Sequence, residues 1–163
     1  MNMSNAFIYK IKAKYLVVTA QDDWDDDLLR AIYSYTESHS EISPKEKEIL
    51  KKGIKDHGTE KTLYRGLNGD FSHLKIDDFI TMNGLISCTE NEDVAYKFAK
   101  GKSLDKPNRH KAGAVITLTE QGLPITQGRF DDEEEYLIIG QGNYYIKEID
   151  FNEKAQIHYI TVY

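Results

Sequence analysis

Residues 131–139 have the sequence DDEEEYLII, an acidic run that passes directly into an apolar strand. In a strand, residues two apart project from the same face, so we expect Glu133 and Glu135 to project together and Glu134 to oppose them. Like charges side by side destabilise a strand, which favours a functional use for the pair. Paired carboxylates suit a cationic, oxocarbenium-like transition state, where one acid stabilises charge and the other handles a proton. The alternative is a solvated acidic loop.

Short alternating segments bounded by Gly, Asn, Asp or Pro surround this stretch and predict further strands. These segments are TLYRGL (62–67), FITMNGLISCT (79–89), AGAVITLT (112–119), EEYLIIG (134–140), NYYIKEIDF (143–151) and AQIHYITVY (155–163). One helix, EDVAYKFAKG, is expected between them, with Asn91 or Thr89 as its N-cap.

The first 61 residues are expected to be mainly helical. Residues 6–19 alternate and then become continuously apolar, which predicts a strand or a short extended lead-in. Apolar residues recur at helical spacing from Trp24 to Tyr35, after an acidic cluster that suits a helix N-terminus.

A second helix has a complete start signal. Ser43 can cap it, Pro44 suits its first position, and Glu46 completes a capping box. Helices followed by mostly antiparallel strands make an α+β class. We expect a single domain over residues 1–163, with a helical lead-in (1–61) and a strand-rich core (62–163).

Composition narrows the function classes. The formal charge of −6 gives no general attraction to nucleic acid. One cysteine forbids an internal disulfide, and no apolar run is long enough to span a membrane, so a cytoplasmic protein is expected. The five histidines lack ligand spacing, which predicts no metal site. No Gly-rich phosphate loop is present.

Three local patterns follow one another in the strand-rich part. Arg65 lies inside a short apolar strand, Ser87-Cys88-Thr89 ends another, and the glutamates come last. Each pattern alone has a structural explanation. A strand arginine usually pairs with a carboxylate or extends to water, and a Ser-x-Thr at a strand end is often a turn or cap.

In this order the patterns resemble those of the arginine-type mono-ADP-ribosyltransferases, over roughly residues 62–163. The resemblance extends to the binary-toxin catalytic domains, and most of all to the small phage Mod-type enzymes that modify host proteins. Two departures stand out. Ser87-Cys88-Thr89 replaces the typical Ser-Thr-Ser, and Ile139 stands where a proline often ends the strand.

The resemblance implies an α+β fold with a two-sheet β core that takes NAD⁺ as substrate, without a metal or a Rossmann fold. It implies that Arg65 holds the phosphates of NAD⁺ and that Ser87 orients Glu135 and the nicotinamide ribose. Glu135 would stabilise the oxocarbenium ion as nicotinamide leaves. Glu133 would position and deprotonate the acceptor, which is expected to be an arginine because both glutamates of the pair are kept.

Further contacts are expected from the same resemblance. Tyr64, Gly66, Phe98 and Arg109 would contact NAD⁺, although aromatic residues at such spacing usually pack in the core. The loop that meets the acceptor would span residues 126–132. Its contact residues would be Arg129 and Phe130. The acceptor would be a protein, such as a transcription or translation protein in the cytoplasm of a phage host.

Other functions remain open from the residues. An NAD⁺ glycohydrolase would use the same residues and pass ADP-ribose to water. A glycosidase would need carboxylates facing each other across a cleft and would give Arg65 and Ser87 no role. A non-enzymatic interaction protein would use the acidic runs, residues 22–27 or 131–135, as a docking surface.

Overall fold

The structure is a computed structural model. It describes residues 6–11, 14–19, 24–37, 42–102, 104, 107, 109–125 and 134–163. None of the described helices is long and apolar enough to cross a membrane.

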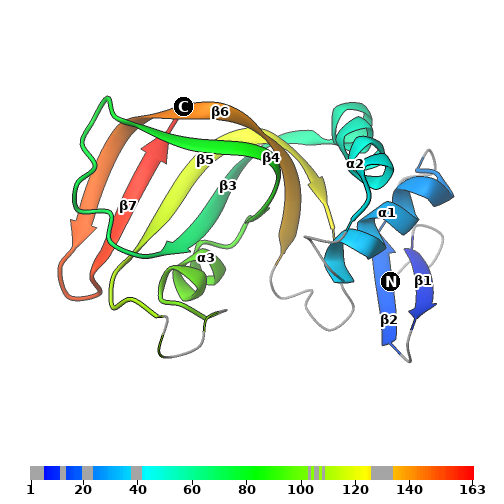
Figure 1. Cartoon of the computed structure of the whole chain (residues 1–163), viewed down its shortest axis with the longest axis horizontal. Coiled ribbons are helices and arrows are strands. Elements are labelled where there is room, and N and C mark those ends of the chain that lie inside the picture. Colours follow the sequence, from blue (N-terminus) through cyan, green and yellow to red (C-terminus); the bar gives the residue numbers. More distant parts are fainter. Residues whose placement is uncertain are drawn as a thin grey trace.

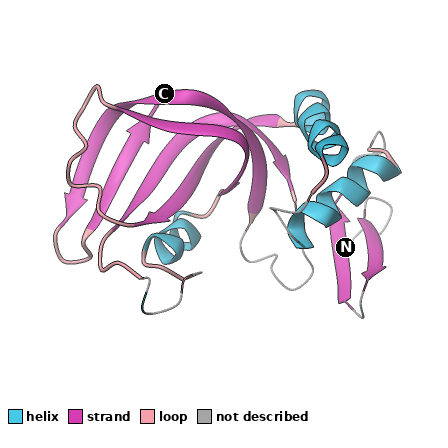
Figure 2. Cartoon of the chain, in the orientation of Figure 1, coloured by secondary structure: helices cyan, strands magenta, loops and turns pink. Residues whose placement is uncertain are grey.

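The elements follow the predicted order of helices before strands, with a hairpin in front (Figures 1 and 2). The hairpin consists of β1 (Ala6–Ile11) and β2 (Lys14–Thr19), so the expected extended lead-in forms two antiparallel strands. The helices are α1 (Asp26–Glu37), α2 (Pro44–His57) and α3 (Glu92–Ala99). The remaining strands are β3 (Thr59–Asn68), β4 (Phe79–Thr89), β5 (Gly113–Pro124), β6 (Glu135–Asn152) and β7 (Ile157–Val162).

Local signals explain the helix starts. Ser43 and Glu46 form the predicted capping box of α2, and Pro44 is its first residue. Each member of the box satisfies a backbone N–H that the first helical turn leaves without a partner. Asn91 caps α3 by accepting from the Asp93 backbone N–H.

The strands β3 to β7 form one five-stranded mixed sheet that curves strongly (Figure 1). β3 pairs with β5 along its whole length, and β4 pairs with the first part of β6. The second part of β6 pairs with β7, which runs parallel to β5. β3 and β4 share only the Tyr64–Thr89 pair in the register of their ladder. The expectation of a mostly antiparallel core is therefore confirmed.

Two of the three buried apolar clusters among the described residues join α1 and α2 to the sheet and the strands to one another. The side chains of α1 and α2 pack on the ends of β5 and β6, where Leu123, Ile125 and Leu137 are fully buried. A second core packs side chains of β3 to β7 together around Leu63, Ile116 and Ile138. The helices α1 and α2 thus lie against one end of the sheet, as Figure 1 shows, with the hairpin beyond them.

One expectation about the strands is wrong. The segments 134–140 and 143–151 were expected as separate strands because Gly140 and Gly142 suggested a turn. They form the single strand β6 of 18 residues. Gly140 is instead needed for close packing, because a Cβ there would collide with the Met82 carbonyl oxygen on β4.

α3 packs on the sheet at unusually short range. Added Cβ atoms at Gly66 and Gly113 would collide with the backbone carbonyls of Ala95 and Ala99 on α3. Ala95 and Ala99 are themselves fully buried, so small residues on both sides let helix and strands meet. Gly66 therefore has a packing role that any residue with a side chain would disrupt.

We predict that Gly66→Ala destabilises the fold, because the new methyl group meets backbone that cannot rotate away. Overpacking of this kind costs about 1–3 kcal/mol or more, which lowers the Tm of a chain of this size by at least several degrees. Thermal unfolding followed by circular dichroism measures the loss.

Gly53→Ala is the matched control. There the added Cβ meets only the flexible end of the Leu28 side chain, and alanine improves helix propensity within α2. A Tm loss for Gly66→Ala no larger than that of Gly53→Ala would contradict the packing argument.

Candidate active site

A cleft of about 1040 Å³ opens where β3 and β4 separate. The two strands are paired at Tyr64 and Thr89, and beyond this point each continues with its other neighbour. Residues of both strands line the cleft, together with side chains from α1, α2 and α3. Its volume is close to the upper limit that is usual for ligand pockets.

Three of the predicted catalytic residues line this cleft. Arg65, Ser87 and Glu135 come from β3, β4 and β6 respectively. The register explains why they meet, because Thr89 pairs with Tyr64 on one side and with Glu135 on the other. Motifs separated by many residues in the sequence thus become neighbours across three strands.

Arg65 is held by the strand it faces. Its Nη1 donates a hydrogen bond of 2.7 Å to the carbonyl oxygen of Ser87. A guanidinium carries five N–H donors in a rigid plane, and this bond anchors the group at Nη1 while using one donor. The remaining geometry suits an anion such as a phosphate, which accepts two parallel hydrogen bonds from a guanidinium.

Ser87 contacts a residue that the sequence did not point to. The hydroxyl of Tyr35 on α1 lies 2.7 Å from Ser87 Oγ. Tyr35 is almost fully buried, and its pKa is raised by burial, while the hydrogen bond to Ser87 lowers it and the Glu135 charge raises it. Tyr35 had only the helical spacing of a core residue, and that spacing holds no information about its hydroxyl.

Glu135 is the first residue of β6 and is half-buried at the cleft. Its carbonyl oxygen accepts from the Ile125 N–H at 2.9 Å, which anchors its backbone to the chain after β5. The preceding Glu134 has a left-handed backbone with φ of 46°. Strand alternation therefore begins at Glu135, so it does not determine the direction of the Glu133 side chain. Glu133 lies outside the described residues.

An ion pair and a backbone hydrogen bond connect the ends of β3, β4 and β6. Lys61 Nζ on β3 lies 2.7 Å from Glu90, the residue after β4, and this contact lowers the Glu90 pKa. The Glu90 N–H in turn donates to the Glu134 carbonyl oxygen at 3.3 Å. The chain on both sides of the Thr89–Glu135 pair is thereby fixed.

Cys88 takes no part as a nucleophile. Its side chain is buried, and burial raises its pKa to about 12, so the thiol stays protonated at neutral pH. A reactive cysteine needs the opposite, a lowered pKa and access to solvent. The Cys88 thiol between Ser87 and Thr89 is therefore a buried, protonated side chain.

Only some of the other predicted NAD⁺ contact residues lie at the cleft. Tyr64, Gly66 and Phe98 line the cleft, and Tyr64 also packs against α3. Arg109 does not line the cleft and lies against Gly101. The predicted acceptor-loop residues Arg129 and Phe130 lie outside the described residues. No group of metal-ligating side chains occurs in the described part of the chain.

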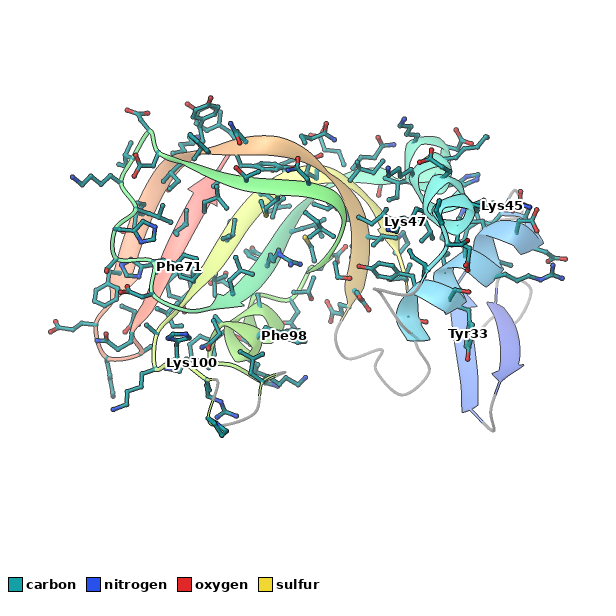
Figure 3. All side chains as sticks on the ribbon, in the orientation of Figure 1. Tyr33, Lys45, Lys47, Phe71, Phe98 and Lys100 are labelled. Atoms are coloured by element: carbon teal, nitrogen blue, oxygen red, sulfur yellow. The ribbon has the colours of Figure 1, made fainter. Side chains whose placement is uncertain are left out.

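The cleft is cationic although the protein is acidic. Lys47 and Lys51 of α2 line it with Arg65, against Glu135 as the single described acid in its lining. Figure 3 shows Lys47 on the side of α2 that faces the sheet and Lys45 on the other side. Lys47 and Lys51 are one helical turn apart and therefore lie on the same face of α2. The sequence shows this spacing, but it does not show that this face of the helix borders a cleft.

No protein-family model matches the chain, and no curated protein sequence matches it. Solved structures do match. The ADP-ribosyltransferase Vis from Vibrio splendidus, in complex with agmatine, aligns with a TM-score of 0.58 and 16% identity, covering 86% of this chain and 75% of Vis.

Two further structures give similar values. Exoenzyme S from Pseudomonas aeruginosa, in complex with human 14-3-3 protein beta and bound to Carba-NAD, aligns with a TM-score of 0.60 at 14% identity, covering 85% of this chain and 73% of its own. C3stau2 from S. aureus with NAD aligns with a TM-score of 0.56 at 15% identity, covering 86% and 87%. The chain therefore shares the fold of these structures, the ADP-ribosyltransferase fold of Vis, and the expected α+β fold class is confirmed.

Proposed function

We propose that the protein is an NAD⁺-dependent mono-ADP-ribosyltransferase that modifies arginine side chains of a protein. The observation that carries the proposal is the meeting of Arg65, Ser87 and Glu135 in one cleft of the ADP-ribosyltransferase fold. Fold alone supports many activities, so the argument depends on these side chains and their chemistry.

The cleft suits NAD⁺ as the donor. NAD⁺ carries an anionic pyrophosphate, and Arg65, Lys47 and Lys51 line the cleft with Glu135 as the single described acid in its lining, although Lys51 also pairs with Glu48 at 3.5 Å. Arg65 is oriented by its bond to Ser87 and offers the planar donor set that phosphates favour. Exoenzyme S and C3stau2, two proteins of this fold, were solved with Carba-NAD and with NAD.

The reaction breaks the bond between nicotinamide and C1 of its ribose. Nicotinamide leaves with the bonding electron pair, which neutralises its ring and leaves an oxocarbenium ion on the sugar. The Glu135 carboxylate at the cleft stabilises that positive charge, which is present in the transition state and absent from bound NAD⁺. The acceptor nitrogen then forms a new bond to C1 and loses a proton.

Arginine is the proposed acceptor. A guanidinium is protonated at all ordinary pH values and becomes a nucleophile only when a nearby base takes its proton. Glu133 is placed two residues before Glu135 in the sequence and supplies that base. Agmatine, which was solved bound to Vis, carries the same guanidinium group as arginine.

Glu135→Gln should lower nicotinamide release by about 10²–10³-fold, the usual effect of removing one electrostatic contact to a transition state. Labelled NAD⁺ incubated with the purified protein and a cell lysate measures both release and transfer. Glu134→Gln is the matched control, because Glu134 is exposed and is not among the residues lining the cleft. Equal activity of wild type and Glu135→Gln, or none in wild type, would refute the proposal.

Glu133→Gln should suppress transfer to agmatine or arginine while NAD⁺ hydrolysis continues at a rate within about threefold of wild type, because water needs less help than a guanidinium. The ratio of labelled agmatine to free nicotinamide reports the split. A parallel loss of both products would show that Glu133 acts on the donor, and would remove the basis for arginine as the acceptor.

Arg65→Lys should weaken NAD⁺ binding, since lysine keeps the charge but loses the planar donor set and the bond to the Ser87 carbonyl. We expect the KM for NAD⁺ to rise about tenfold or more, with Arg65→Ala weaker still. Steady-state nicotinamide release gives KM and kcat separately. An unchanged KM in Arg65→Lys would place the phosphates elsewhere in the cleft.

A further inference from the structure

The helix α1 reaches the catalytic strands through one side chain. Tyr35 lies near the C-terminal end of α1, and its hydroxyl meets Ser87 Oγ across 52 positions of the sequence. The ring of Tyr35 packs in the core between α1, α2 and the ends of β5 and β6. Its hydroxyl end lines the cleft beside Ser87 and Glu135. The ring of Tyr35 therefore belongs to the apolar core, while its hydroxyl oxygen belongs to the candidate active site.

The direction of the Tyr35–Ser87 hydrogen bond matters for the site. A serine hydroxyl has one proton to donate and can accept at its oxygen, and a phenol is the more acidic donor. Burial raises the Tyr35 pKa, so the phenol remains protonated through neutral pH and keeps a proton to give. The Glu135 charge also raises the Tyr35 pKa and favours the protonated phenol, while the Arg65 charge lowers that pKa.

We propose that Tyr35 is a positioning residue for the transferase reaction, donating to Ser87 Oγ so that the serine proton is left to point at Glu135 or at the ribose of NAD⁺. Without this bond the serine hydroxyl would be free to rotate and to donate its hydrogen bond to other acceptors. The backbone of Ser87 is already fixed from the other side by Arg65, which binds its carbonyl oxygen. Tyr35 and Arg65 thus hold the side chain and the main chain of one residue. This inference rests on the proposed function.

The position of Tyr35 gives the helical lead-in a role in the site. The same cleft is lined by Thr36 near the end of α1, by Ile42 just before α2, and by Lys47 and Lys51 on α2. A shift of α1 relative to β4 would lengthen the Tyr35–Ser87 bond before it disturbed any contact within the sheet. The helices are therefore part of the catalytic unit rather than a support for it.

Tyr35→Phe tests the proposal, because it removes one oxygen and keeps the buried ring. We expect kcat for nicotinamide release to fall about tenfold with KM for NAD⁺ within about twofold, the pattern of an interaction made in the transition state. Tyr33→Phe is the matched control: it makes the same change on the same helix at a residue that does not line the cleft. Its kcat should stay within about twofold of wild type.

A double-mutant cycle with Ser87→Ala separates positioning from general loosening of α1. If Tyr35 acts through the serine hydroxyl, Tyr35→Phe should change kcat by less than about twofold once Ser87 is alanine. A full tenfold loss in that background would overturn the proposal, and so would a wild-type kcat in Tyr35→Phe. Circular dichroism of each variant confirms that equal amounts of folded protein are compared.

Failure of this inference differs from failure of the proposed function. A wild-type protein that releases nicotinamide, with a Tyr35→Phe variant that does so equally well, would overturn the role of Tyr35 alone. A wild-type protein that releases no nicotinamide from NAD⁺ would overturn the proposed function and the role of Tyr35 with it.

Discussion

The pairing of Tyr64 with Thr89 joins β3 to β4, and the cleft depends on the absence of any further β3–β4 pair in this register. From this pair onward β3 stays with β5 and β4 stays with β6, so the two strands separate and leave backbone and side chains facing a gap. Two fully paired strands would have filled that space. The incomplete ladder thus creates the room for a ligand and also sets Arg65, Ser87 and Glu135 around it.

The surroundings of the cleft keep the separated strands in place. α3 presses on β3 at Gly66, where helix and strand backbones meet without side chains between them. The Lys61–Glu90 ion pair ties β3 to the end of β4, and Tyr35 ties β4 to α1. Surface ion pairs contribute little to stability, so the value of the first contact lies in geometry. The gap is held open by packing on one side and by polar contacts on the other.

Much of this architecture could be predicted from local patterns. The capping box at Ser43, the helix after Asn91 and the strand 79–89 were all identified from the sequence, because each depends on neighbours only a few residues away. The order of the three motifs was also enough to propose which residues meet. What local patterns cannot contain is the partner of a side chain across the fold. Tyr35 and the lysines of α2 have ordinary helical spacing, and only the position of α1 and α2 against the sheet reveals what they face.

At the glycines of β6 a local pattern led to a wrong prediction. Gly140 and Gly142 suggested a break in the chain, yet one accommodates the Met82 carbonyl and the other adopts a left-handed φ of 98° within a continuous strand. A glycine in a strand can mark a turn or a close approach of another backbone, and the sequence alone does not distinguish them. For Glu133 the difficulty is different, because Glu134 breaks the alternation that would have fixed its direction.

The length of β6 has a consequence for how the protein opens. Its first part carries Glu135 and pairs with β4, and its last part pairs with β7. The amide protons along one strand exchange with solvent together when that strand detaches from its neighbours as a cooperative unit. The catalytic end of β6 pairs with β4 on one edge and, at Tyr136 and Leu137, with β5 on the other, so both edges of the strand are paired next to Glu135. Leu137 and Ile138 follow Glu135 closely and are fully buried, Leu137 in the core with α1 and α2 and Ile138 in the core of the sheet strands. We therefore expect their amide protons to exchange slowly, so that the active-site edge of β6 borders a rigid stretch of the strand.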